Sequence, residues 1–245
     1  MVNQGSILKR SPYMDQEYFD TWVDYDEKAI QKFESTISDP STSETQRRRL
    51  RYTISRRRLE LLLSRYSRGE GIDILCRSFP RIVSSMEEYH SEERHEPIDF
   101  RALTNYVSSL WLVSLAILCD ADAETMQRLL RVIDNEGRDE LFERLVALRV
   151  PGRSVPNGLM HPNPYRPLLD AVNSTGDNRE KNIREFLKIY YKGMKGTYWY
   201  DSHKKLDAGF FGYWCLELAA LVKGLGIDDR SFSDNPFYPR DFAGK

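Results

Sequence analysis

The sequence predicts an all-α fold, and two observations support this prediction. Apolar side chains recur three or four positions apart over most of the 245 residues, as they do on one buried face of a helix. Val, Ile and Thr nowhere alternate with polar residues over a length that would form a strand. Since 40% of the residues are hydrophobic, we expect two helical halves, 12–134 and 135–242, packed into one bundle-like globule.

The N-terminal half is predicted to contain five helices. Asp15 can cap a first helix that extends to about Ser38, where Asp39-Pro40-Ser41 breaks the chain. A second helix begins at Ser43 or Thr45 and ends before two glycines at 69 and 71. The apolar spacing then predicts helices over about 72–90, 99–119 and 123–134.

The most apolar run of the chain is 107–119, which has no polar face. A helix of this kind is surrounded by other helices, so we expect it at the centre of the N-terminal half. The run is shorter than the roughly 20 residues that span a bilayer. Residues 1–10 also lack the apolar segment of a secretory signal, and we therefore expect a soluble cytoplasmic protein.

The C-terminal half begins with a helix near 139–148, after which the pattern changes. Residues 150–167 hold five prolines and two glycines, and a single helix cannot contain them because each proline removes a backbone donor. We expect a long ordered loop or a joint between halves there. Further helices are predicted near 168–174, 179–191 and 208–222.

Glu217 lies on an apolar and aromatic face of the last predicted helix, with Tyr213 and Trp214 one turn earlier. An unpaired carboxylate there is costly, so we expect Glu217 to be buried and to meet a donor. The candidates are the indole of Trp214 or a tyrosine hydroxyl, or one of the side chains His203, Lys204, Lys205 and Arg240.

Residues 211–241 carry the most distinctive pattern. An aromatic-Gly-aromatic-Trp run at 211–214 precedes Glu217, and Asp228-Asp229 and Tyr238-Pro239-Arg240-Asp241 follow. This pattern resembles the C-terminal hallmark of the PoNi family of bacterial immunity proteins, over about the last forty residues. The resemblance implies a structural family motif made of His203, Gly212, Trp214, Glu217, Asp228, Tyr238, Pro239 and Asp241.

The resemblance also implies a function. PoNi-type proteins are two-part helical antitoxins encoded beside polymorphic toxins, often DNases, that contact-dependent machinery such as type VI secretion delivers. We therefore expect a non-enzymatic, cofactor-free inhibitor that binds a cognate nuclease toxin in the cytoplasm and blocks its active site or DNA groove.

Acidic clusters are the candidates for toxin binding. A nuclease groove is basic because it holds DNA, and an inhibitor can offer carboxylates in place of phosphates. The alternative is an ordinary solvated surface, or helix caps for the second and third clusters. The candidates are Glu87, Glu88, Glu92 and Glu93, then Asp120, Asp122 and Glu124, then Asp134, Glu136, Asp139 and Glu140.

Two other function classes stay open. One is an all-helical enzyme that uses Glu217 and His203, with Asp207 as a possible metal ligand, although the sequence lacks HExxH, HxH and CxxC spacings. The other is a nucleic-acid-binding regulator that uses the arginines from Arg47 to Arg58, although the net charge of −1 is unlike that of a basic domain. These arginines are equally suited to an acidic surface on a toxin or on a second copy in a homo-oligomer.

Overall fold

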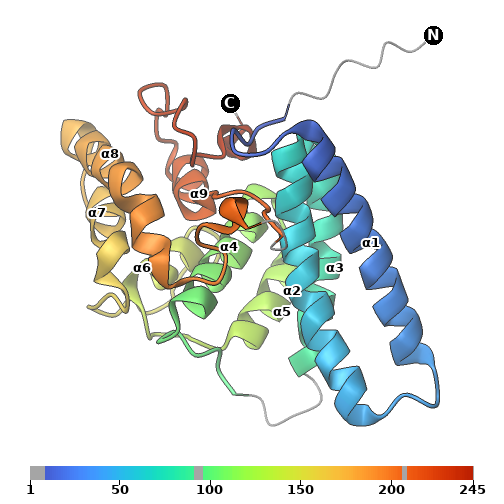
Figure 1. The fold of residues 1–245 in the computed structure, drawn as a ribbon. Helices are drawn as coiled ribbons and strands as arrows, with labels where there is room; N and C mark the ends of the chain where they lie inside the picture. The colour runs from blue at the N-terminus through green and yellow to red at the C-terminus, as the bar shows by residue number, and fades with distance from the viewer. Residues whose placement is uncertain (1–8, 91–95, 206–208, 245) are drawn as a thin grey trace. The chain divides into compact units, whose positions relative to one another are not determined.

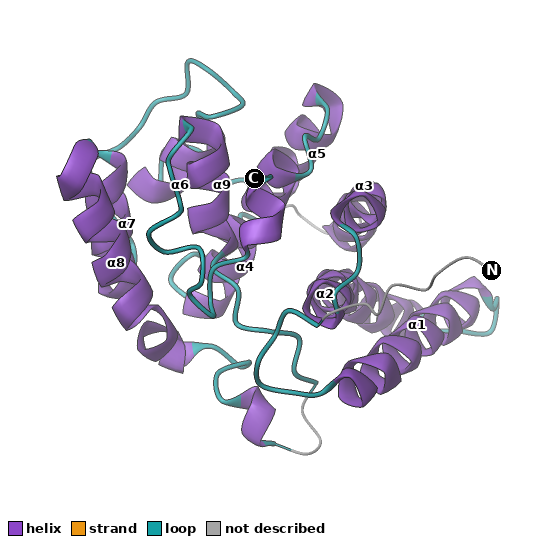
Figure 2. Cartoon of the chain, turned by 90° about the horizontal axis from the view of Figure 1, so that it is seen from above, coloured by secondary structure: helices purple, strands orange, loops and turns teal. Residues whose placement is uncertain are grey.

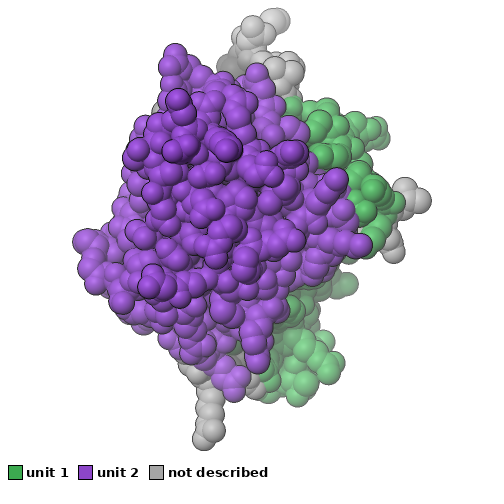
Figure 3. Space-filling model, turned by 90° about the vertical axis from the view of Figure 1, so that its left-hand side faces the viewer, with its two compact units in different colours: residues 1–95, 201–212 green, residues 96–200, 213–245 purple. Residues whose placement is uncertain are grey.

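The computed structural model describes residues 9–90, 96–205 and 209–244. Its regular secondary structure over these residues is helical throughout, which confirms the predicted all-α class. The chain forms two compact units, coloured separately in Figure 3: unit 1 holds residues 1–95 and 201–212, and unit 2 holds 96–200 and 213–245. The boundaries of the predicted halves, 12–134 and 135–242, differ from this division and stay a prediction.

Unit 1 contains three helices that lie side by side in both ribbon views (Figures 1 and 2). Asp15 caps the first by accepting a hydrogen bond from the Tyr18 backbone N–H at 2.8 Å, and Ser43 caps the second. Gly69 ends the second helix with a φ of 112°, which glycine adopts without steric cost. The helices are α1 (Gln16–Ser38), α2 (Glu44–Arg68) and α3 (Ile72–His90).

Residues 201–212 return to unit 1 and complete its core. The Phe210 ring lies 6.1 Å from that of buried Phe19, and the Phe210 backbone N–H donates to the Tyr18 hydroxyl at 2.6 Å. The Ser67 hydroxyl at the end of α2 donates to the Phe211 carbonyl at 2.7 Å. The core of unit 1 is therefore built from two segments that are far apart in the sequence.

Unit 2 is organised around α4, which is buried over most of its length and packs against α5, α6 and α9. The prediction of a helix surrounded by others is confirmed, but α4 lies in the unit that also holds the C-terminal helices. No helix among the described residues is long and apolar enough to cross a membrane. The helices are α4 (Leu103–Leu118), α5 (Ala123–Ile133), α6 (Glu140–Val146), α7 (Pro162–Val172), α8 (Gly176–Gly193) and α9 (Leu216–Leu225).

Two predicted elements are wrong in their bounds. The last helix begins at Leu216, because Gly212 has a φ of 110° and the Cys215 N–H donates to the Phe237 carbonyl instead of to a helical partner. Helix α7 begins at Pro162, inside the segment expected to be a loop. Pro162 is tolerated at the first helical position because an N–H there needs no intrahelical acceptor, and the backbone at Asn163 departs from helix (φ −105°, ψ 112°) before the rest of α7.

Candidate functional site

The third acidic cluster surrounds the start of α6, and Asp139 is its buried member. Asp139 Oδ1 accepts from the Phe142 backbone N–H and the Tyr106 hydroxyl, both at 2.9 Å, and Oδ2 accepts from the Met160 N–H at 2.8 Å. Burial raises the pKa of Asp139, and these hydrogen bonds oppose the rise. Asp139 is therefore a structural cap and not a free surface carboxylate, while Asp134 ends α5 and is exposed.

A buried ion pair beside this cap was not predicted. Glu143 is fully buried and accepts two hydrogen bonds from the Arg153 guanidinium, at 2.6 and 2.7 Å. The Gly137 N–H adds a third at 2.9 Å, and exposed Glu136 lies 3.2 Å from Arg153. Neighbouring Glu140 forms an i,i+4 ion pair on α6. Glu136 and Glu140 of the third cluster are thus engaged in ion pairs.

The second acidic cluster lies at the turn between α4 and α5. Asp120 lies 2.7 Å from Lys223 and 3.1 Å from Arg149, and these two cations lower its pKa. Asp122 caps α5 by accepting from a backbone N–H in its first turn at 2.7 Å. Glu124 is exposed on that turn. All three carboxylates of this cluster reach solvent.

The first acidic cluster lies in the last turn of α3. Glu88 is exposed and forms an ion pair with Arg81 at 3.0 Å, whereas Glu87 is half-buried. Glu92 and Glu93 lie outside the described residues. The structure thus places the three predicted clusters on different elements.

Part of the C-terminal motif is held in place by hydrogen bonds within unit 2. The Tyr190 hydroxyl on α8 donates to the Trp214 carbonyl at 2.9 Å, and the Tyr238 hydroxyl donates to Asp229 at the same distance. Trp214 and Tyr238 are both buried, whereas Gly212 belongs to unit 1 and has a φ of 110° that favours glycine. The first bond holds the segment before α9 against α8, and the second joins two of the final turns of the chain to each other.

The remaining motif residues do not all share this role. Asp228 is largely exposed and pairs with a neighbouring arginine, as Asp241 does. Pro239 precedes the short 3-10 helix Arg240–Ala243. His203 belongs to unit 1, where its ring packs against Tyr13 at 4.8 Å, and burial lowers its pKa. The motif is therefore divided between the two units.

Glu217 is fully buried in unit 2, as its neighbours in the sequence predicted. No donor among the described residues meets hydrogen-bond geometry at its oxygens, but the Tyr165 hydroxyl and the Trp111 indole lie close enough to lower its pKa. Burial outweighs them and raises the pKa of Glu217 to about 7. The expected tyrosine hydroxyl is thus that of Tyr165, the indole that lies near is that of Trp111 and not of Trp214, and His203 belongs to unit 1.

The arginine-rich helix α2 is largely engaged within unit 1. Within Arg47–Arg58, several arginines form ion pairs with carboxylates of α1 and α2, and Arg47 donates to backbone carbonyls before the helix. Asp26, one of these carboxylates, is buried and its pKa is raised by burial despite its arginine partner. The pairs are Arg51–Glu44, Arg56–Glu60, Arg57–Asp26 and Arg58–Glu34. These carboxylates neutralise positive charge that a phosphate-binding surface would require.

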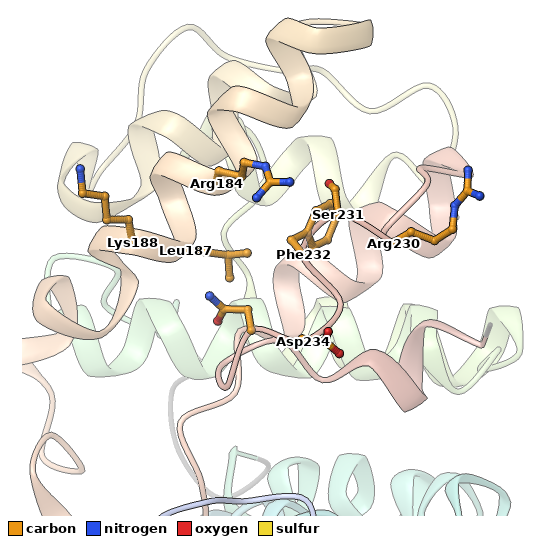
Figure 4. Close-up of a pocket in the computed structure, with 8 residues that line it drawn as sticks. Arg184, Leu187, Lys188, Arg230, Ser231, Phe232 and Asp234 are labelled. Atoms are coloured by element: carbon orange, nitrogen blue, oxygen red, sulfur yellow. The ribbon is translucent and has the colours of Figure 1, made fainter.

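Unit 2 has a surface pocket of about 300 Å³ between α8 and the C-terminal turns (Figure 4). Buried Leu187 and Phe232 contribute apolar surface, and Arg184 points toward Ser231. Arg184 is itself paired with Glu180 at 2.9 Å. Among the described residues no three His, Cys, Asp or Glu side chains form a group that could hold a metal ion.

Two family models match this chain: the N-terminal region of PoNe immunity protein (PoNi) over residues 10–131, and the C-terminal region over 137–242. The chain belongs to the PoNi family of immunity proteins. A search of curated proteins finds no match. Among solved structures, the crystal structure of protein PA2201 from Pseudomonas aeruginosa matches with a TM-score of 0.75 and 18% identity. The match covers 96% of this chain and 92% of that chain, and it shows a shared fold.

PoNi membership confirms the family resemblance and extends it beyond the last forty residues. The C-terminal PoNi match contains the whole 211–241 pattern. The N-terminal PoNi match includes α4 and most of α5, which belong to unit 2. The sequence boundary between the two PoNi regions therefore differs from the boundary between the compact units.

Proposed function

We propose that this PoNi protein protects a bacterial cell by binding a cognate PoNe-type toxin stoichiometrically, and that the toxin is a nuclease delivered by a type VI secretion system. The observation that carries the proposal is the PoNi family match over nearly the whole chain. Binding takes place in the cytoplasm, where a DNase reaches its substrate. The protein acts by occupying the toxin's active site or DNA groove and has no turnover of its own.

The two ends of α5 are the best-supported part of the predicted toxin-binding surface. Asp120, Asp122 and Glu124 are exposed before or at its start, and Asp134 and Glu136 are exposed after its end. At a rise of 1.5 Å per residue, an 11-residue helix separates the two groups by about 16 Å. Carboxylates so placed complement a basic groove and raise the association rate.

Buried Asp139 is excluded from this surface, because a contact with toxin would require the loss of its three hydrogen bonds. The candidates on α3, Glu87 and Glu88, belong to unit 1 and form a separate and smaller group. They remain candidates together with Glu92 and Glu93. Glu140 is half-buried and remains a weaker one.

Co-expression with the toxin encoded by the neighbouring gene tests the function. The expected result is survival of the host cells and recovery of a 1:1 complex with inhibited nuclease. Replacing Glu124 and Glu136 together by Lys is expected to slow association about tenfold at low salt. Asp177→Lys with Glu185→Lys, two exposed charge reversals on α8, is the matched control and is expected to leave the rate unchanged.

The outcomes separate the alternatives. Failure of the unmodified protein to bind or protect against its toxin would remove the proposed function. If the protein protects cells against a toxin that has no nuclease activity, the immunity role stands and the proposal that the toxin is a nuclease is wrong. If the unmodified protein, the α5 double variant and the control associate with the toxin at equal rates, the toxin does not bind at the ends of α5.

A further inference from the structure

Helix α1 of unit 1 carries three aromatic side chains, here called the aromatic row, on a side that is not buried. Tyr18, Trp22 and Tyr25 follow one another at spacings of four and three residues, which places them on one face of the helix. The ring centroids of Tyr18 and Trp22 lie 5.9 Å apart, and those of Trp22 and Tyr25 lie 5.5 Å apart. Tyr25 is 53% exposed. Exposed and clustered aromatic rings of this kind are typical of a protein-binding surface.

The aromatic row is held in place by unit 1 itself. The Tyr18 hydroxyl accepts from the Phe210 backbone N–H, and the Trp22 ring lies so close to Gly209 that a Cβ there would be 3.4 Å from it. The Arg57 guanidinium on α2 lies 5.6 Å from the centre of the Tyr25 ring. Rings that are already positioned lose little conformational freedom when a partner binds, so the aromatic row is preorganised for binding.

A strip of exposed carboxylates, here called the acidic strip, runs along α1 beside the aromatic row. Its members are three or four residues apart and therefore share one face of the helix: Glu17, Asp20, Asp24 and Glu27. Within the part of the chain that the structure describes, Glu17 and Glu27 form no ion pair. The other two each face one cation, Arg68 at 3.6 Å and Lys28 at 2.6 Å. The acidic strip thus keeps an excess of negative charge.

The charge of the acidic strip decides which kind of partner fits this side of α1. Nucleic acids and anionic membranes are repelled by it. A second copy of the chain that packed α1 against α1 would bring two acidic strips together, and such like-charge contacts cost free energy. A basic protein segment is attracted, because an Arg or Lys side chain can lie over an aromatic ring and also donate to a carboxylate.

We propose that the aromatic row and the acidic strip of α1 together bind a basic segment of the cognate toxin. An Arg or Lys of the toxin lies over the exposed ring of Tyr25, and neighbouring cations of the same segment pair with Glu17 and Glu27. Trp and Tyr side chains that anchor a partner beside complementary charges are typical of the residues that dominate binding energy. This inference rests on the proposed immunity function, since a toxin that acts on DNA presents basic residues. It adds a surface of unit 1 to the candidates at the ends of α5.

The first test measures the affinity for the toxin encoded by the neighbouring gene, purified as a catalytically inactive variant, by titration calorimetry. Tyr25→Ala removes the exposed ring and is expected to raise Kd at least tenfold, whereas Tyr25→Phe keeps the ring and should stay within threefold. Tyr52→Ala on α2 is the matched control and should stay within twofold. Tyr52 is 52% exposed, and its ring likewise lies beside one neighbouring aromatic ring, at 5.3 Å.

The second test addresses charge. Glu17→Lys with Glu27→Lys reverses the two carboxylates of the acidic strip that form no ion pair, and it is expected to raise Kd at least tenfold at low salt and less at high salt. Asp177→Lys with Glu185→Lys on α8 is the matched control and should stay within twofold. Circular dichroism and urea unfolding establish that each variant is folded, and the charge variant decides the matter if Tyr25→Ala is not.

Unchanged affinity for the toxin in either folded α1 variant would overturn the inference and leave the immunity function intact. An equal loss of affinity in Tyr52→Ala would overturn it as well, because the effect would not be specific to the aromatic row. If the unmodified protein self-associates in analytical ultracentrifugation and Tyr25→Ala abolishes this, the aromatic row binds a second copy and not the toxin. An unmodified protein that fails to bind the toxin would instead remove the proposed function itself.

Discussion

The hydroxyl of Tyr106 on α4 donates to Oδ1 of Asp139, the cap of α6, at 2.9 Å inside the core of unit 2. Asp139, which the sequence predicted to be a toxin-binding residue, is thus hydrogen-bonded to the central helix α4. Asp139 joins the start of α6, the core helix α4 and the loop that contains Met160. Its loss would release three parts of unit 2 together.

Asp139→Ala is expected to lower the free energy of unfolding by about 2–4 kcal/mol, because it removes a helix cap and leaves a buried hydroxyl without an acceptor. Tyr106→Phe removes one of three donors and should cost about 1 kcal/mol. Urea unfolding measures both. Glu185→Ala, at an exposed site, should change stability by less than about 0.5 kcal/mol. An Asp139→Ala protein as stable as this control would show that the cap is unimportant.

Arg153→Ala is expected to cost about 3–5 kcal/mol, because it leaves the Glu143 carboxylate buried without its cation. The double variant Glu143→Leu with Arg153→Met should recover most of this loss, since an apolar pair of similar volume needs no charge partner. Thermal unfolding of the three proteins compares them. A double variant as unstable as Arg153→Ala would mean that packing, and not the unpaired charge, sets the cost.

Glu217 gives stability a defined pH dependence. Its pKa is about 7 in the folded protein, against an ordinary value of 4.5. Below about pH 4.5 Glu217 is protonated in both the folded and the unfolded protein, so it does not make the free energy of unfolding depend on pH there. As the pH rises from 4.5 to 7 the unfolded chain ionises first, and stability falls by up to about 3 kcal/mol.

Glu217→Gln removes this titration. The stability of the variant relative to the unmodified protein should therefore rise from pH 4.5 to pH 7.5, as followed by urea unfolding across that range. If the difference in unfolding free energy between the variant and the unmodified protein does not change with pH, the pKa of Glu217 is not raised in the folded protein. Full immunity in the variant is expected as well, because Glu217 is buried and has no catalytic role in the proposed function.

Gly212→Ala is expected to destabilise the protein by about 1–3 kcal/mol, because a φ of 110° is strained for any residue with a Cβ. Gly209→Ala is the matched control. A Cβ there would lie 3.4 Å from the Trp22 ring, which is ordinary contact, and the change should be small. Differential scanning calorimetry distinguishes the two, and equal effects would contradict the conformational argument.

Local signals in the sequence predicted the helices well. The caps Asp15, Ser43 and Asp122 lie at the helix starts because a side-chain oxygen satisfies a backbone N–H only a few residues away. The unbroken apolar run predicted a buried α4 for the same local reason. The start of α9 was missed, since it depends on a backbone bond from Cys215 to Phe237.

The roles of charged residues were harder to predict, because they depend on distant partners. Glu143 lies among four buried apolar residues in α6, and this was the available signal that its carboxylate is buried. The same acidic segment gave no sign that Arg153, within the proline- and glycine-rich segment that follows, supplies the cation. Acidic clusters in a sequence are therefore mixtures of caps, buried pairs and solvated groups.

The position of residues 201–212 in unit 1 has a consequence for how the chain is made. On the ribosome, α1, α2 and α3 emerge early, but the segment whose Phe210 contacts Phe19 is synthesised only after all of residues 96–200. Unit 1 must wait in an incomplete state while unit 2 is being translated, and its unfilled core is then exposed to chaperones and proteases. The core of unit 1 is therefore completed only once residue 212 has been synthesised, and that of unit 2 only once α9 has followed.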